Sequence, residues 1–222
     1  MAGAILVGGR SRRMEGLDKT EMRRDGERVI RRNIDLLRNV CSPVLLICRD
    51  RDQERYFAEL FPDTTVTNDR FASAGPLGSL AVALENSDTN VFLLACDMPF
   101  IEASLVKMLF SLFQKAPRNA LLPRSPLVFD AAPNSADWQI EPLCSIWPHR
   151  CLQRAWDMCE GSEQSGHNDG GRKLSLTKFA QRVRARYVDL LPEEAMQMRN
   201  INTRVDLANA PGLEIQNTKL QQ

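Results

Sequence analysis

The order of apolar and amphipathic segments predicts an α/β fold in which helices flank a mostly parallel sheet. Short apolar runs alternate with longer stretches whose apolar residues recur at helical spacing. Two of the runs, residues 44–47 (VLLI) and 91–95 (VFLLA), are apolar on successive positions, as is typical of strands covered on both faces. The 222 residues suit one core, and no linker divides them. We therefore expect a single domain with a doubly wound, Rossmann-like sheet.

The expected elements follow one another along the chain in this alternating order. The short apolar runs are assigned to strands at residues 2–7, 44–48, 64–67, 91–96, 120–122, 139–147 and 183–188. The amphipathic stretches are assigned to helices near residues 29–39, 51–60, 77–85, 101–114, 151–159, 174–181 and 203–209.

Two segments break this pattern. Residues 160–171 (EGSEQSGHNDGG) are polar and rich in glycine and serine, so we expect a mobile surface insertion there. The residues after Gly212 lack an apolar face. We therefore place the domain at residues 1–210 and expect residues 211–222 to form a mobile tail.

The overall charge argues against a general nucleic-acid coat. Lys and Arg total 29 against 28 Asp and Glu, which leaves a net charge of +1. The basic residues are nevertheless clustered, because Arg10, Arg12, Arg13 and Lys19 form one group. A second group comprises Arg23, Arg24, Arg28, Arg31 and Arg32. Such clusters could draw an anionic ligand to one edge of the protein.

The cysteines and the hydropathy indicate a cytoplasmic protein. The 6 cysteines contain no CxxC pair and lie mostly in apolar runs, which favours reduced, buried thiols over disulfides or a zinc site. The 2 histidines leave little for His-based metal or triad chemistry. No apolar run approaches the roughly 20 residues of a membrane helix. Gly8 and Gly9 end the N-terminal apolar run too early for a signal peptide.

A glycine-containing segment directly follows the first expected strand. Residues 8–19 (GGRSRRMEGLDK) would lie beyond the carboxyl end of that strand, where open α/β sheets bind ligands. Because Gly8 and Gly9 have no Cβ, their backbone could approach a base or a phosphate. The segment matches neither G-x-G-x-x-G nor G-x-x-x-x-G-K-[ST]. A tight strand-to-helix turn with solvated arginines would explain the same residues.

A second glycine segment precedes an apolar helix face. In residues 75–80 (GPLGSL), Pro76 can begin a helix without losing a hydrogen bond. A helix N-terminus is suited to an anion or a base. Simple punctuation at the start of a helix is the alternative interpretation.

Asp97 follows the buried run 91–96, so we expect it at the same sheet edge as the glycine segment. Its carboxylate could hold Mg²⁺ against phosphate oxygens, because hard cations prefer oxygen ligands. It could equally cap the next helix, with Pro99 in the first turn. The position alone does not decide between these roles.

In order and spacing, these segments resemble the molybdenum cofactor guanylyltransferases. Residues 6–19 are similar to the family signature L-A-G-G-x-S-x-R-M-G-x-D-K, with Val7 in place of alanine and Glu15 before Gly16. Residues 75–79 are similar to G-P-L-A-G, with Ser79 at the last glycine. Cys48 stands where the family often has asparagine. The resemblance spans about residues 3–209.

The resemblance also implies roles for single residues. Asp69 would bind the nucleotide, and Asp97 would bind both the nucleotide and Mg²⁺. Arg13 and Lys19 would hold the triphosphate. The remaining contacts to GTP would come from Leu6, Val7, Gly8 and Gly9.

The C-terminal half carries weaker similarities. Residues 141–147 (EPLCSIW) are similar to E-P-L-x-A-x-Y, the part of the family that faces the pterin substrate, and residues 172–175 (RKLS) resemble R-x-L-S. Residues 200–207 (NINTRVDL) resemble N-[IV]-N-T-P-E-D-L. Thr203 and Asp206 have capping-box spacing. The box could begin the last helix while Asn200 and Asn202 face the substrate.

The resemblance implies transfer of GMP from GTP to the terminal phosphate of molybdopterin or its molybdenum-loaded form, with release of pyrophosphate. Asp97, Lys19 and Arg13 would form the catalytic set, with Mg²⁺ as cofactor. Molybdoenzymes or their chaperones could be partners, whereas nucleic acid and membranes are not expected.

Two other functions fit the same residues. One is a related nucleotidyltransferase that uses CTP or a sugar-phosphate acceptor. The other is a non-catalytic nucleotide-binding regulator, which the departures at Glu15, Cys48 and Ser79 leave open.

Overall fold

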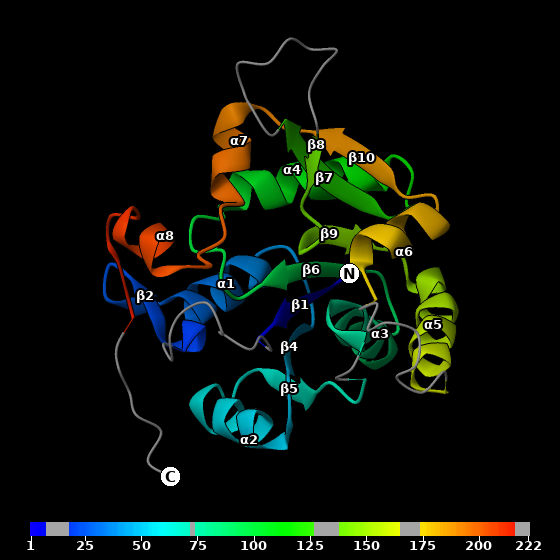
Figure 1. Ribbon diagram of the computed structural model, residues 1–222, viewed down its shortest axis with the longest axis horizontal. Helices are drawn as coiled ribbons and strands as arrows, with labels where there is room; N and C mark the ends of the chain where they lie inside the picture. Colours follow the sequence, from blue (N-terminus) through cyan, green and yellow to red (C-terminus); the bar gives the residue numbers. More distant parts are fainter. Residues whose placement is uncertain (8–17, 72–73, 127–137, 165–173, 216–222) are drawn as a thin grey trace.

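The fold is built on one long sheet that runs through the molecule (Figure 1). A computed structural model describes residues 1–7, 18–71, 74–126, 138–164 and 174–215. The strand order is β10-β7-β9-β6-β1-β4-β5, and β8 pairs with β7. These strands are β1 (Ala2–Leu6), β4 (Val44–Cys48), β5 (Thr65–Asn68), β6 (Val91–Ala95), β7 (Leu121–Pro126), β8 (Trp138–Ile140), β9 (Cys144–Trp147) and β10 (Arg186–Asp189).

Most pairs in this sheet are parallel, as the sequence predicts. β1 pairs in parallel with β4 and β6, β4 with β5, and β7 with β10. The exceptions are β9, which is antiparallel to β6 and β7, and β8, which is antiparallel to β7. The mostly parallel α/β fold is therefore confirmed.

Helices cover both faces of the sheet. On one face, α1 (Val29–Arg38) and α4 (Ala103–Gln114) pack with Phe57 of α2 (Arg51–Leu60). On the other face lie α3 (Pro76–Ser87), α5 (Leu152–Gln164) and α6 (Leu176–Arg182). The side chains of β1 alternate between these layers: Ile5 packs on the first and Leu6 on the second. This alternation explains why successive residues of the central strands are apolar.

A second, three-stranded antiparallel sheet was not predicted. It has the order β11-β2-β3 and consists of β2 (Met22–Arg24), β3 (Glu27–Arg28) and β11 (Leu213–Ile215). Its strands are short and mostly charged, so they carry no apolar run. The usable signal was Asp25-Gly26, whose φ angles of 54° and 83° form the tight hairpin turn that such a pair favours. The remaining short elements are η2 (Lys19–Glu21), η4 (His149–Cys151), α7 (Pro192–Gln197) and α8 (Arg204–Ala208).

Several predicted boundaries need correction. The expected strand at 139–147 is two strands, because Glu141 forms a turn by accepting the Leu143 N–H. The strand expected at 183–188 begins only at Arg186, since Arg184 is left-handed with φ 53°. In the expected insertion, residues 160–164 continue α5, and the rest lies outside the described residues. The expected tail contributes β11, with residues 216–222 outside the described part.

The burial and pairing of the cysteines are as predicted from the sequence. All six are buried and free, which confirms the expectation of buried, unpaired thiols. Across the ranges that the structure describes, no helix combines the length and apolarity that a membrane crossing requires.

Gly78 provides a test of the packing beside α3. A Cβ at this position would lie 2.6 Å from the carbonyl oxygen of Phe71. We expect Gly78→Ala to destabilise the protein by about 1–3 kcal/mol, because the backbone must shift to admit the methyl group. The matched control is Gly161→Ala in α5, where nothing lies within 4 Å. That variant should gain about 0.5–1 kcal/mol from helix propensity. Urea unfolding measures both, and equal stabilities would contradict the close approach.

Candidate active site at the carboxyl edge of the sheet

The central strands end side by side at one edge of the sheet. Leu6 of β1 pairs with Ala95 of β6, and the Cys96 N–H donates to the Leu6 carbonyl at 3.1 Å. This pairing delivers Asp97 next to the end of β1. Val7 is buried, and its N–H donates to the Ile47 carbonyl. Gly8, Gly9 and Arg13, which are predicted to continue the site, lie outside the described residues.

Three predicted site residues meet at one ammonium group. The Lys19 Nζ lies 2.7 Å from Asp97 Oδ2 and donates to Asn202 Oδ1 at 2.6 Å. The side chains of Lys19 and Asp97 are only 16% and 17% exposed. Because these residues are separated by 78 and 183 positions, only the fold brings them together. The cluster joins the residue predicted for the triphosphate, the one for Mg²⁺ and one for the acceptor.

Local hydrogen bonds hold the backbone segments that carry Lys19 and Asn202. Asp18 accepts the Thr20 N–H and begins η2, which carries Lys19. On the other side, the Ile201 N–H donates to the Asp97 carbonyl at 3.1 Å. The predicted capping box of Thr203 and Asp206 is confirmed, and Asp206 also accepts the Asn202 N–H. These backbone contacts fix Asn202 in front of Asp97.

A second pair of polar side chains lies near this cluster. Glu141 is 9% exposed and accepts the Leu143 N–H at 3.0 Å and the Asn200 amide at 2.9 Å. Burial raises the pKa of Glu141 to about 7; the two hydrogen bonds lower it and the Asp97 charge raises it. Sequence reasoning did not select Glu141 as a site residue. The available signal was a carboxylate inside the EPL segment, directly before an apolar strand.

Asp69 lies at the carboxyl end of β5, two strands from β1. It is 8% exposed, and its carboxylate accepts the Phe71 N–H and the Ser79 hydroxyl, each at 2.8 Å. These bonds tie the end of β5 to the start of α3. Ser79, which replaces the family's last glycine, therefore has a structural partner. In this chain Asp69 organises the loop before α3, and nucleotide binding by it stays a prediction.

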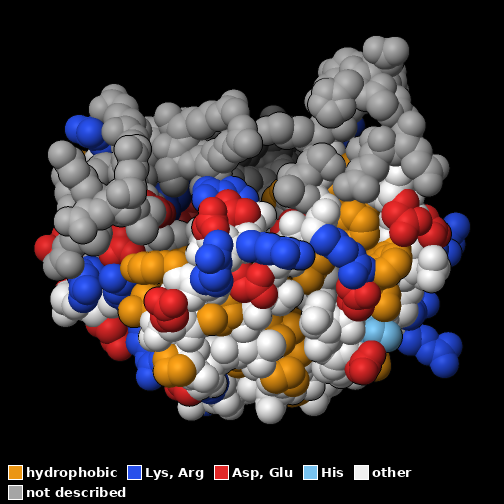
Figure 2. Space-filling view, turned by 90° about the horizontal axis from the view of Figure 1, so that it is seen from below, with side chains coloured by type: hydrophobic (Ala, Val, Ile, Leu, Met, Phe, Trp, Pro, Cys, Tyr) orange, Lys and Arg blue, Asp and Glu red, His pale blue; other side chains and the backbone are white. Residues whose placement is uncertain are grey.

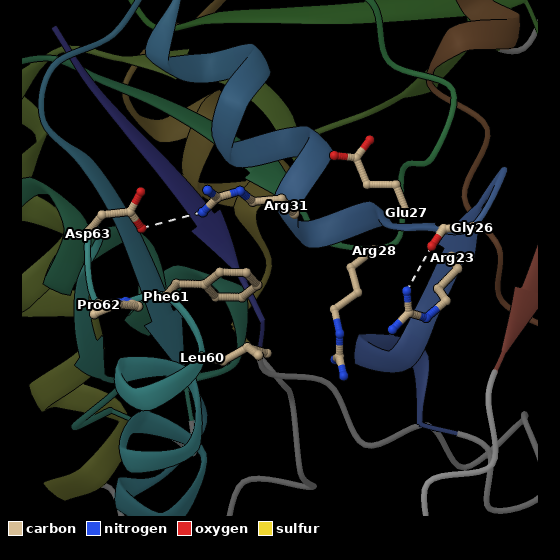
Figure 3. A pocket seen from close by; sticks show the side chains of 9 residues that line it. All are labelled: Arg23, Gly26, Glu27, Arg28, Arg31, Leu60, Phe61, Pro62 and Asp63. Atoms are coloured by element: carbon tan, nitrogen blue, oxygen red, sulfur yellow. Dashed lines mark hydrogen bonds and ion pairs between the residues drawn. The ribbon is translucent and has the colours of Figure 1, made fainter.

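The second arginine cluster lines a separate hollow of about 650 Å³ (Figure 3). Arg23, Arg28 and Arg31 lie around it, and residues 60–62 form an apolar wall. Arg28 pairs with Glu21 at 2.7 Å, and Arg31 pairs with Asp63 at 3.4 Å. These carboxylates offset much of the arginine charge. None of Lys19, Asp97 and Asn202 lines the hollow.

The face that includes α2 is also mixed in charge. Figure 2 shows basic and acidic side chains next to one another there, rather than a patch of one sign. The clustering of arginines along the sequence therefore does not produce a uniformly basic surface on this side.

The buried Glu141 predicts a pH dependence of stability. Its pKa is raised from 4.5 to about 7 on folding, so its favourable contribution is present below about pH 4.5 and lost as the pH rises through about 7. Relative to Glu141→Gln, the wild type should lose about 3 kcal/mol of unfolding free energy between about pH 4 and pH 8. Urea unfolding of both proteins across this range measures the difference. Parallel curves for the two proteins would show that Glu141 is not held in this environment.

The sequence of this chain is similar to a known protein family and to several known proteins. A family model described as a MobA-like NTP transferase domain matches residues 3–176. A probable molybdenum cofactor guanylyltransferase of Methanosarcina acetivorans is 32% identical over 168 residues, covering 72% of this chain and 69% of that protein. One of Opitutus terrae is 30% identical over 206 residues, covering 91% and 90%. The molybdenum cofactor guanylyltransferase of Pseudomonas entomophila is 30% identical over 164 residues, covering 72% and 78%.

The fold agrees with a solved structure as well. The crystal structure of molybdopterin-guanine dinucleotide biosynthesis protein A from Archaeoglobus fulgidus matches with a TM-score of 0.70 at 22% identity, covering 94% of this chain and 96% of that one. The resemblance indicated by the motifs is thus confirmed: this chain belongs to the family of MobA-like NTP transferase domains.

Proposed function

We propose that this chain transfers GMP from GTP to the terminal phosphate of molybdopterin or of its molybdenum-loaded form, and releases pyrophosphate. The names of the relatives support this reaction, among them one that aligns over 91% of this chain. The observation that carries the proposal is the convergence of Lys19, Asp97 and Asn202 within 2.7 Å of one ammonium nitrogen.

The reaction requires that the two phosphates be aligned and that the developing charge be neutralised, and it requires no general base. An oxygen of the acceptor phosphate forms a bond to the α-phosphorus of GTP. The bond between this phosphorus and the oxygen that bridges the α- and β-phosphates breaks, and pyrophosphate leaves. Because the acceptor phosphate is already anionic, no proton has to be removed from it. Catalysis then depends on positioning and on neutralising the charge of the leaving pyrophosphate.

The residues at the edge fit a Mg²⁺ ion in their chemistry. Asp97 Oδ2 and Asn202 Oδ1 are hard oxygen donors that already converge on one cation, the Lys19 ammonium. Asp97 would hold the ion, which when bound would supply positive charge against the phosphate oxygens. In the described ranges no three His, Cys, Asp or Glu side chains gather into a metal site. Phosphate oxygens and water would therefore complete the coordination, as is usual for Mg²⁺.

Each remaining residue has a defined task in this proposal. Lys19 would exchange Asp97 and Asn202 for the phosphates of GTP, and Arg13 would assist it. Asn200 and Asn202 would contact the acceptor.

Six buried free thiols favour a reducing compartment, so we place the reaction in the cytoplasm.

GTP should stabilise the protein more than CTP, ATP or UTP does. Ligand at about 100 times its dissociation constant adds about 2.7 kcal/mol to the unfolding free energy, which a melting curve resolves. In the presence of Mg²⁺, adding molybdopterin should then start the release of pyrophosphate.

The same assay separates the alternatives. A larger shift with CTP would overturn the guanylyl assignment, and release with a sugar phosphate in place of molybdopterin would change the acceptor. Stabilisation by GTP without any release would indicate a nucleotide-binding regulator.

Asp97→Asn should abolish most turnover in a folded protein. The neutral amide keeps the shape of the side chain but is a poor Mg²⁺ ligand, so we expect a loss of about a hundred- to a thousand-fold. Pyrophosphate release at saturating GTP and Mg²⁺ measures the rate, and a melting curve checks the fold. The matched control is Asp63→Asn, which breaks an ion pair with Arg38 of 2.8 Å at the surface and should keep full turnover. Normal turnover of Asp97→Asn would remove this residue from the mechanism.

A further inference from the structure

A buried carboxylate holds the side-chain amide of Asn200. The Asn200 Nδ2 donates to Glu141 Oε2 at 2.9 Å, and the other Glu141 oxygen accepts the Leu143 N–H at 3.0 Å. Through the Leu143 N–H, one oxygen of Glu141 is held by its own turn between β8 and β9. The backbone of this turn therefore keeps the second oxygen beside the Asn200 amide.

While Glu141 is ionised, this contact allows only one orientation of the amide. An ionised carboxylate has acceptors and no donor, so it can face the NH₂ group of Asn200 but not the carbonyl oxygen. Rotating the amide by half a turn would place Oδ1 against Glu141 Oε2, two acceptors at hydrogen-bond distance. Glu141 thus fixes which end of Asn200 points away from it.

The end of the Asn200 amide that points away from Glu141 is its carbonyl oxygen, which is a hydrogen-bond acceptor without a donor among the described residues. Asn200 Oδ1 is buried and has no hydrogen-bond partner in the part of the chain that the structure describes. A buried carbonyl oxygen without a donor is costly, and native proteins keep few of them. Because Asn202, two residues further on, contacts Lys19, this oxygen lies on the segment that reaches the reaction centre.

We propose that Glu141 is a positioning residue that holds Asn200 Oδ1 ready to accept a hydrogen bond from an N–H group of the acceptor's heterocycle. The inference rests on the proposed function, since the pterin ring of molybdopterin carries such N–H donors. The acceptor must displace the atoms that shield the oxygen in the unliganded protein.

Glu141→Gln tests this role while keeping the size of the side chain. Glutamine has one acceptor oxygen, which the Leu143 N–H would retain, and it would turn its NH₂ group toward Asn200. The asparagine amide should then rotate, so that an N–H donor replaces the acceptor that faces the substrate. At about pH 8, above the raised pKa of Glu141, the KM for molybdopterin should rise by about tenfold or more, with the KM for GTP changed less than about twofold.

Two further variants separate positioning from packing. Asn200→Ala should raise the KM for molybdopterin by a similar factor, and adding Glu141→Gln to it should have no further effect, because Glu141 acts through Asn200. Ser87→Ala is the matched control: it breaks part-buried hydrogen bonds to the carbonyl groups of Leu84 and Thr89 at the C-terminal end of α3. It should lower the melting temperature without changing the KM for molybdopterin.

Direct binding distinguishes failure of this inference from failure of the proposed function. Wild-type protein that neither binds molybdopterin nor releases pyrophosphate would refute the function. Equal molybdopterin affinities of the wild type and Glu141→Gln, or multiplying effects in the double variant, would refute the role of Glu141 alone. The side-chain NMR signal of Asn200, assigned by its loss in Asn200→Ala, should shift in Glu141→Gln even without ligand. An unchanged signal would refute the claim that Glu141 fixes the orientation of the Asn200 amide.

Discussion

The contact between the Lys19 ammonium and the Asp97 carboxylate is the interaction on which the arrangement of the candidate site depends. Asp97 reaches this position because β6 pairs in parallel with β1, and Lys19 reaches it through the short helix that begins at Asp18. Asn202 joins them from the far end of the chain. The ammonium donates hydrogen bonds to two oxygen acceptors, of which the Asp97 carboxylate is anionic, and a triphosphate would compete with them for it. In the proposed reaction, binding of the nucleotide therefore frees Asp97 and Asn202 at the same time.

Stability and function make opposite demands on the polar groups near this contact. Asp69 is as buried as Glu141, yet its carboxylate accepts hydrogen bonds from Phe71 and Ser79 and ties a loop to α3. Glu141 instead has a pKa raised by burial, and its partner Asn200 keeps an unpaired oxygen. Buried titratable groups with a shifted pKa cluster at functional sites. This tendency supports the proposal that Glu141 acts beside the acceptor, whereas the hydrogen bonds of Asp69 give it a part in organising the fold.

Sequence periodicity predicted what the large core determines. The runs at residues 44–47 and 91–95 specify central strands because their side chains must be apolar on both faces. It missed β2, β3 and β11, whose few residues are mostly charged, because their small apolar cluster joins Met22 to Ile201 and Leu213 from the far end of the chain. Likewise, the motifs selected Lys19, Asp97 and Asn202 one at a time, but not Glu141. The EPL segment marks the carboxylate, but its proposed role depends on a contact with Asn200 across 59 positions, which only the fold creates.

Charge alone would have pointed to a different part of the surface. Among the described residues, the hollow is lined by three arginines, Arg23, Arg28 and Arg31, whereas the cluster at the sheet edge contains one cation, Lys19. However, Arg28 and Arg31 are paired with the carboxylates of Glu21 and Asp63, so an anion binding there would have to break existing ion pairs. At the edge, the parallel strands bring their carboxyl ends together and the partly buried Lys19 and Asp97 are held by backbone contacts. Fixed, poorly solvated charges act strongly on a reacting phosphate, because they need no reorganisation when charge develops. For this reason we assign the proposed reaction to the edge where the strands end rather than to the arginine hollow.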